Sequence, residues 1–277
     1  MIFAYGDESM DEKKERVCTV AALIGTSDQW KVIQAGWIER TKGIPFHANN
    51  CDSDRGDYEN SPHLENKALY RDLIIMLANS GICGFAATID LVAQAKTFPL
   101  VNRATLTSRT YFQAFMEVVA QMAGFAEHAD EIAEITFDSR IESEHNAAIL
   151  YANMRELNPG WTSRVASKLI FDSSRINPRI QVADLFAREA MKTFDNEFGP
   201  VKRPIRKSWE ALSSTGRFPV FGYGEQWFAD LKVDIERGVP QEAFDGDGYL
   251  KWLGDRQDNM TAFIEYTKIL FKNRTSS

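Results

Sequence analysis

The sequence is poor in the features that mark membrane, secreted and disulfide-rich proteins. None of its apolar runs is long enough to cross a bilayer, and its N-terminus lacks the basic and apolar regions of a signal peptide. It has three cysteines, which lie far apart without C-x-x-C spacing, so neither a disulfide framework nor a zinc ribbon is indicated. These absences predict a cytoplasmic protein with reduced cysteines and no membrane partner.

Several common catalytic and nucleotide-binding motifs are also missing. The chain has no G-x-x-x-x-G-K-[ST] or G-x-G-x-x-G loop and no G-x-S-x-G elbow. Two acidic stretches, "DSDRGDYEN" and "DGDGYLKWLGD", lack the glycine and glutamate positions of an EF-hand. Phosphate-cradling loops, serine-hydrolase chemistry and EF-hand calcium binding are therefore not indicated.

The composition and charge are those of an acidic globular protein with one basic stretch. The chain has 277 residues, 44% of them hydrophobic, which is enough to bury a full core. The net charge is −7, but residues 164–217 contain eleven Lys and Arg against six Asp and Glu. The densest basic run, "KRPIRK", predicts one of two things: a solvated loop, or a nucleic-acid-binding face formed by Lys202, Arg203, Arg206 and Lys207.

The spacing of apolar residues alternates between extended and helical segments. Residues 2–7 and 16–25 are predicted to form an antiparallel hairpin, with a second strand that is continuously apolar and buried on both faces. Further strands are predicted at 82–91, 134–139 and 167–173, and helices at 27–43, 64–80, 107–127, 144–156 and after Asn177. This alternation indicates a layered α/β domain over residues 1–199. Residues 200–277, rich in Gly, Pro and aromatics, are predicted to be an extension packed on that domain.

Carboxylates stand where predicted strands end and within one predicted helix. Asp7 and Glu8 follow the first strand with no basic residue beside them, and Asp138 follows "EITF". Asp184 lies in "NPRIQVADLFAREA", on a mostly apolar helix expected to pack on the sheet. A buried carboxylate there requires a cation or hydrogen-bond donors. Asp184 is therefore predicted either to pair with Arg188 or to bind a metal.

Four motifs, "YGDES", "FHANN", "FDSR" and "IQVADLFA", resemble in their order the domain of unknown function family 3800. The resemblance covers roughly residues 1–195, and that family is grouped with the RNase H-like, or retroviral integrase-like, folds. It implies a mixed sheet flanked by helices, with two Mg²⁺ or Mn²⁺ ions held by Asp7, Asp138 and Asp184. The implied activity is hydrolysis of phosphodiester bonds in DNA or RNA by a two-metal mechanism.

Three further residues are candidates for this implied site. Consecutive strand residues point to opposite faces, so Glu8 joins Asp7 as a ligand only if the backbone turns near Gly6; an exposed turn glutamate is the alternative. His47 is predicted to serve as general acid or base, to contact a phosphate, or to be an ordinary loop histidine. Gln181 is predicted to hydrogen-bond a ligand carboxylate or a phosphate, or to be an ordinary polar helix residue.

The function predicted from these observations is a divalent-metal-dependent nuclease. The alternative, from a different class, is a catalytically silent module that binds nucleic acid or a protein partner in a mobile-element or phage-defence system. A third alternative, a small-molecule phosphohydrolase, would have a closed pocket in place of a basic groove. For a nuclease, neutralising residues 202–207 should weaken substrate binding and reduce its salt dependence.

Overall fold

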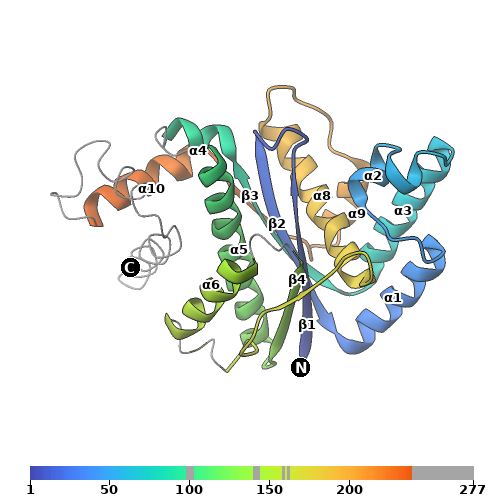
Figure 1. The fold of residues 1–277 in the computed structure, drawn as a ribbon, viewed down its shortest axis with the longest axis horizontal. Coiled ribbons are helices and arrows are strands. Elements are labelled where there is room, and N and C mark those ends of the chain that lie inside the picture. The colour runs from blue at the N-terminus through green and yellow to red at the C-terminus, as the bar shows by residue number, and fades with distance from the viewer. Residues whose placement is uncertain (98–102, 140–143, 158–159, 161–162, 239–277) are drawn as a thin grey trace.

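The computed structural model describes residues 1–97, 103–139, 144–157, 160 and 163–238. Its centre is a six-stranded sheet made by β1 (Ile2–Met10), β2 (Val17–Thr26), β3 (Cys83–Asp90), β4 (Ala133–Asp138), β5 (Ile170–Asp172) and β6 (Val220–Tyr223). The strands lie in the order β5-β4-β1-β2-β3-β6 (Figure 1). Sequence-distant strands therefore lie side by side, and β4 is the neighbour of β1.

The sheet is mixed. β1 and β2 pair antiparallel, as do β2 and β3, whereas β1 with β4, β4 with β5, and β3 with β6 are parallel pairs. The predicted hairpin is confirmed, and β2 is buried along its whole length except for Thr26, as its continuous apolar sequence predicted. β1 continues as a regular strand to Met10, three residues past the predicted end at Asp7.

Helices cover both faces of the sheet. They are α1 (Ser27–Thr41), α2 (Ala48–Asp52), α3 (His63–Asn79), α4 (Leu91–Thr97), α5 (Arg103–His128), α6 (Glu144–Leu157), α8 (Pro178–Phe198), α9 (Lys207–Ser213) and α10 (Glu225–Gly238). Helices α1, α2, α3, α8 and α9 lie on one side, here called the α8 face, and α4, α5, α6 and α10 on the other, the α5 face (Figure 1). This confirms the predicted α/β class as a mixed sheet flanked by helices.

Each face of the sheet has its own hydrophobic core. Strand alternation assigns the side chains: Ile2 and Ala4 of β1 join the core of the α5 face, whereas Tyr5 joins that of the α8 face. The α5 face is filled by α5, with Phe115 fully buried against Phe137 at a ring-centroid distance of 5.0 Å. No helix among the described residues is long and apolar enough to cross a membrane.

Several element ends differ from the predictions for local reasons. Helix α1 is capped by Thr26 and not by Ser27 or Asp28, because Thr26 forms a capping box with Gln29. The loop predicted after residue 46 contains α2 and a 3-10 turn at Gly56–Tyr58. Helix α4 begins directly after β3 because the Asp90 carboxylate accepts the backbone N–H groups of the first turn.

The C-terminal segment contributes to the same sheet as the rest of the chain. Strand β6 pairs with β3 from Ala86 to Ile89, and the start of α10 follows β6 directly. The described part of the predicted extension, residues 200–238, therefore completes one edge of the sheet and does not only pack on it. Residues 239–277 of that extension lie outside the described residues.

Candidate functional site

Two of the predicted metal ligands stand side by side where β1 and β4 part. The parallel ladder between these strands ends at the pair Gly6 and Phe137, and Asp7 and Asp138 each follow by one residue. Phe137 belongs to the core of the α5 face, so alternation directs Asp138, like Asp7, to the α8 face. One oxygen of Asp138 accepts the backbone N–H of Ser174 at 2.8 Å. The sheet itself thus places two carboxylates at the same end of two neighbouring strands.

Close approach of β1 and β4 at this point depends on a glycine. A Cβ at residue 6 would lie 2.4 Å from the ring of Phe137, well inside any permitted contact. Phe137 is fully enclosed and cannot move aside without disturbing the core of the α5 face. Gly6 therefore sets the spacing of the strands that carry Asp7 and Asp138.

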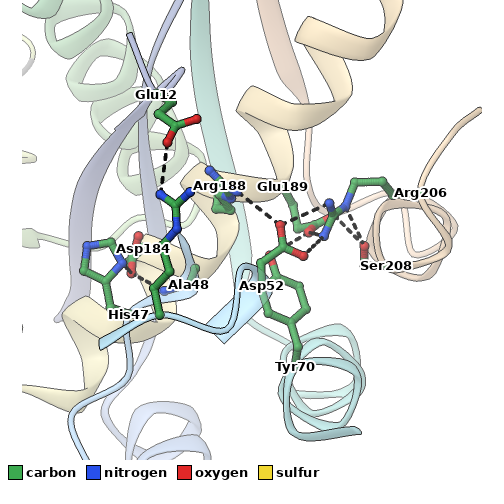
Figure 2. A network of polar contacts seen from close by, with 11 residues as sticks. Glu12, His47, Ala48, Asp52, Tyr70, Asp184, Arg188, Glu189, Arg206 and Ser208 are labelled. Carbon is green, nitrogen blue, oxygen red and sulfur yellow. Dashed lines mark hydrogen bonds and ion pairs between the residues drawn. The ribbon is translucent and has the colours of Figure 1, made fainter. Parts of the chain in front are cut away.

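The third predicted ligand comes from α8. Asn177 caps this helix by accepting the backbone N–H of Arg179 at 3.0 Å, and Pro178 occupies the first turn, so the predicted helix start is confirmed. Asp184 is buried; its Oδ2 accepts the backbone N–H of Ala48 at 2.8 Å and lies 3.5 Å from Nδ1 of His47 (Figure 2). The first residues of α2 therefore hold Asp184.

The electrostatic surroundings of Asp184 differ from those of an ordinary surface acid. Burial raises the pKa of Asp184, and the nearby charge of Asp138 raises it further, although His47, the backbone of Ala48 and Arg188 act in the opposite direction. A carboxylate with a raised pKa, next to a second carboxylate, is typical of sites that use such groups chemically.

The structure separates the remaining candidates. His47 precedes α2 with its side chain 59% exposed beside Asp184. Glu8 lies on the opposite face from Asp7, because β1 stays regular and does not turn at Gly6; it is buried there and is not an exposed turn residue. Gln181 accepts the indole N–H of Trp37 and donates to the carbonyl of Ser174, which fixes the loop that holds Asp138.

The basic run divides into one half-buried and three exposed residues. Arg206 forms ion pairs of 3.0 Å with both Asp52 and Glu189, and its guanidinium lies 5.7 Å from the ring centroid of Tyr70 (Figure 2). The other three are exposed, and they are Lys202, Arg203 and Lys207. Arg206 therefore serves the fold, while the nucleic-acid face predicted for the others stays a prediction.

Arg206 belongs to a buried polar network that joins α2, α3, α8 and α9. Glu189 is fully buried, and its carboxylate also accepts hydrogen bonds from Tyr70 at 2.7 Å and Ser208 at 2.6 Å. Asp52 pairs with Arg188 at 3.1 Å as well as with Arg206. Burial would raise the pKa of Asp52, but the two guanidinium groups outweigh it and lower that pKa. Arg188 thus forms its ion pair with Asp52 of α2 and not with the predicted partner Asp184, which lies one turn earlier on α8.

The residues present can be compared with what a hard cation requires. Asp7, Asp138 and Asp184 offer oxygen ligands on one face of the sheet, which suits Mg²⁺ or Mn²⁺. Among the described residues, however, no three His, Cys, Asp or Glu side chains are gathered into a ready metal-binding group. The donor chemistry fits such an ion, while Asp184 is engaged by Ala48 and His47.

Comparisons with known proteins assign no function to the site. No family model and no curated protein matches this sequence. The features on which an interpretation depends are therefore the paired strand ends, the buried carboxylate on α8, and the exposed histidine beside it.

Proposed function

We propose that the protein is a divalent-metal-dependent nuclease with an RNase H-like fold that hydrolyses phosphodiester bonds in DNA or RNA by a two-metal mechanism. The observation that carries this proposal is that Asp7 and Asp138 follow the paired ends of neighbouring parallel strands, while the buried Asp184 of α8 lies near enough to Asp138 for the charge of Asp138 to raise its pKa. The motif resemblance to domain of unknown function family 3800 supports the same assignment.

Three residues would hold the cations, and they are Asp7, Asp138 and Asp184. Bound Mg²⁺ or Mn²⁺ supplies an activated water and stabilises the leaving oxygen in this type of reaction. Glu8 is left out of the ligand set, because it projects to the α5 face. The backbone N–H of Ser174 and the side chain of Gln181 orient the loop around Asp138.

His47 is the residue best placed to move a proton in this site. Its imidazole lies beside Asp184, and more than half of its side chain faces solvent. An imidazole can donate or accept a proton, and from an exposed position it can exchange that proton with water. We assign it the role of general acid or base, acting on the substrate or on the water that attacks it.

One observation favours the alternative of a silent nucleic-acid- or partner-binding module. Asp184 is held by the backbone of Ala48 and by His47, and the described acids do not form a ready cluster. A protein that kept the fold but lost turnover would retain the same arrangement. The two functions differ in whether Asp138 and Asp184 are needed for metal binding.

The test measures metal binding and cleavage together. Mn²⁺ is titrated by calorimetry into the wild type and into the Asp138→Asn and Asp184→Asn variants, and each is incubated with labelled single- and double-stranded DNA and RNA. Asp172→Asn is the matched control, because Asp172 ends the neighbouring strand in the same "FDS" sequence but accepts a hydrogen bond from Asn177.

We expect the wild type and the Asp172→Asn variant to bind Mn²⁺ and cleave, and the Asp138→Asn and Asp184→Asn variants to lose both properties while remaining folded by circular dichroism. Nucleic-acid binding without Mn²⁺ binding or cleavage would establish the silent module. Equal loss in the Asp172→Asn variant would show that the effect follows from general disruption of the strand ends.

A further inference from the structure

A hollow of about 500 Å³ borders the proposed site. Two of its lining residues also belong to that site: His47 contacts Asp184, and the backbone of Ser174 holds Asp138. Its volume lies within the range of about 300–1,000 Å³ that is usual for small-ligand pockets. The hollow is therefore large enough for a group about the size of one nucleotide, directly beside the carboxylates.

One wall of the hollow is rigid and apolar. Phe46 contributes to the lining, and its ring packs edge-on against Trp37, with ring centroids 5.2 Å apart, and against Tyr58. Phe46 is itself buried, so this wall is held from behind by the core of the α8 face. A pocket with such a wall keeps its shape when empty.

The polar lining has charges and hydrogen-bonding groups without partners. Within the part of the chain that the structure describes, the Arg175 guanidinium and the Asp57 carboxylate form no ion pair, and the Asn50 amide makes no side-chain hydrogen bond. All three line the hollow, and Arg175 and Asp57 are exposed. The hollow thus offers one cation, one anion and one amide that can donate and accept.

We propose that this hollow binds one unpaired nucleotide of the substrate strand, with a base that carries an exocyclic amino group. Arg175 would bind the phosphate, and Asp57 would accept a hydrogen bond from the amino group of adenine, cytosine or guanine. Asn50 can pair with the adjoining edge of the base. The inference rests on the proposed nuclease function and adds to it a substrate class, single-stranded or locally unpaired nucleic acid.

The charge arrangement gives the selectivity. A phosphate alone would be repelled by Asp57, and a base that presents carbonyl oxygens there, such as uracil or thymine, would set two acceptors against each other. In a duplex one hydrogen of the amino group is used in base pairing and the base is stacked between its neighbours, so the base must leave the stack to enter a hollow. Paired substrates should therefore bind less well.

The experiment measures nucleotide binding apart from metal binding and cleavage. AMP, CMP and UMP are titrated by calorimetry, in EDTA, into the full-length protein and into its Arg175→Gln and Asp57→Asn variants. Lys232→Gln removes an exposed positive charge from α10, on the opposite side of the sheet, and serves as the control.

We expect the wild type and the Lys232→Gln variant to bind AMP and CMP about tenfold more tightly than UMP. The Arg175→Gln variant should bind all three nucleotides about tenfold more weakly, because a charge-assisted hydrogen bond is lost. The Asp57→Asn variant should lose most of the preference for AMP over UMP.

Two results would overturn the subsite: absence of AMP binding to the wild type, or equal AMP binding to the Arg175→Gln variant. Equal affinity of the wild type for AMP and UMP would overturn the assignment of Asp57. These outcomes are separate from failure of the nuclease proposal, which would appear as AMP binding of the expected pattern without Mn²⁺ binding or cleavage.

Discussion

The two faces of the sheet are both apolar but differ in how they bury charge. On the α5 face, aromatic and aliphatic side chains such as Phe115 and Ile135 form a continuous core. On the α8 face, a single helix carries Asp184, Arg188 and Glu189, each less than a tenth exposed. Charges are costly to bury, so their concentration under α8 indicates that this face does more than stabilise the fold.

Two acids on α8 show how differently such burial can be compensated. Glu189 receives hydrogen bonds from Tyr70 and Ser208 and an ion pair from Arg206. Asp184, five residues earlier, receives one backbone N–H group and a nearby histidine, and its pKa is raised. The first acid is satisfied by the fold, whereas the second is kept in a state that favours a proton or a cation.

The largest effect is expected when the compensation of Glu189 is removed. Arg206→Met should lower the free energy of unfolding by about 3–5 kcal/mol, because it leaves buried Glu189 and half-buried Asp52 without their shared cation. Urea denaturation measures the change, and the exposed neighbour Lys207→Met is the control. If Arg206→Met left the free energy of unfolding nearly unchanged, the network would not stabilise this face.

An effect of opposite sign is expected at the less compensated acid. Because its pKa is raised on folding, Asp184 reduces stability as the pH rises above its unfolded value of about 4 and through its folded value. In EDTA at pH 7, Asp184→Asn should therefore raise the free energy of unfolding by about 1 kcal/mol. The gain should disappear below about pH 4, where the Asp184 carboxyl is protonated and therefore uncharged, like the asparagine that replaces it.

Urea denaturation of the Asp184→Asn variant between pH 3 and 8 checks this sign. A loss of stability at pH 7 would mean that the hydrogen bond from Ala48 and the neighbouring His47 outweigh the burial of the charge. In that case Asp184 would resemble Glu189, and the contrast between them would fail.

An effect no larger than that at Asp184, but without its pH dependence, is expected on the α5 face. Ile135→Val removes one methyl group from a fully buried position and should cost about 1 kcal/mol, independently of pH and salt. The same change at Ile132, which is 43% exposed, is the control and should be close to neutral. A pH-dependent loss at Ile135 would reveal that this core is coupled to buried acids, either Glu8 on the same face or the charges across the sheet.

Much of the fold could be predicted from local patterns. The hairpin follows from two apolar runs joined by a short charged segment, and the start of α8 follows from an asparagine cap with proline after it. The predicted end of β1 is too early, because the adjacent acids Asp7 and Glu8 are typical of a turn. The antiparallel pairing with β2 carries them as strand residues.

The contacts around the site could not be predicted in the same way. Arg206 looked like its basic neighbours, but its partner Asp52 lies 154 residues away in the sequence. Ala48, which donates its backbone N–H to Asp184, is an alanine in a polar segment and carries no side-chain signal. Such contacts arise from the packing of α2 and α9 against α8, which no local pattern specifies.

The glycine at position 6 makes this part of the chain unusually intolerant of sequence change. Any other residue there would force the ring of Phe137 away from β1, and the neighbouring Asp138 would move with its strand. Saturation mutagenesis at this position should therefore recover glycine alone. Gly6 would then tolerate as few substitutions as the acids beside it, because the ring of Phe137 occupies the space that a side chain would need.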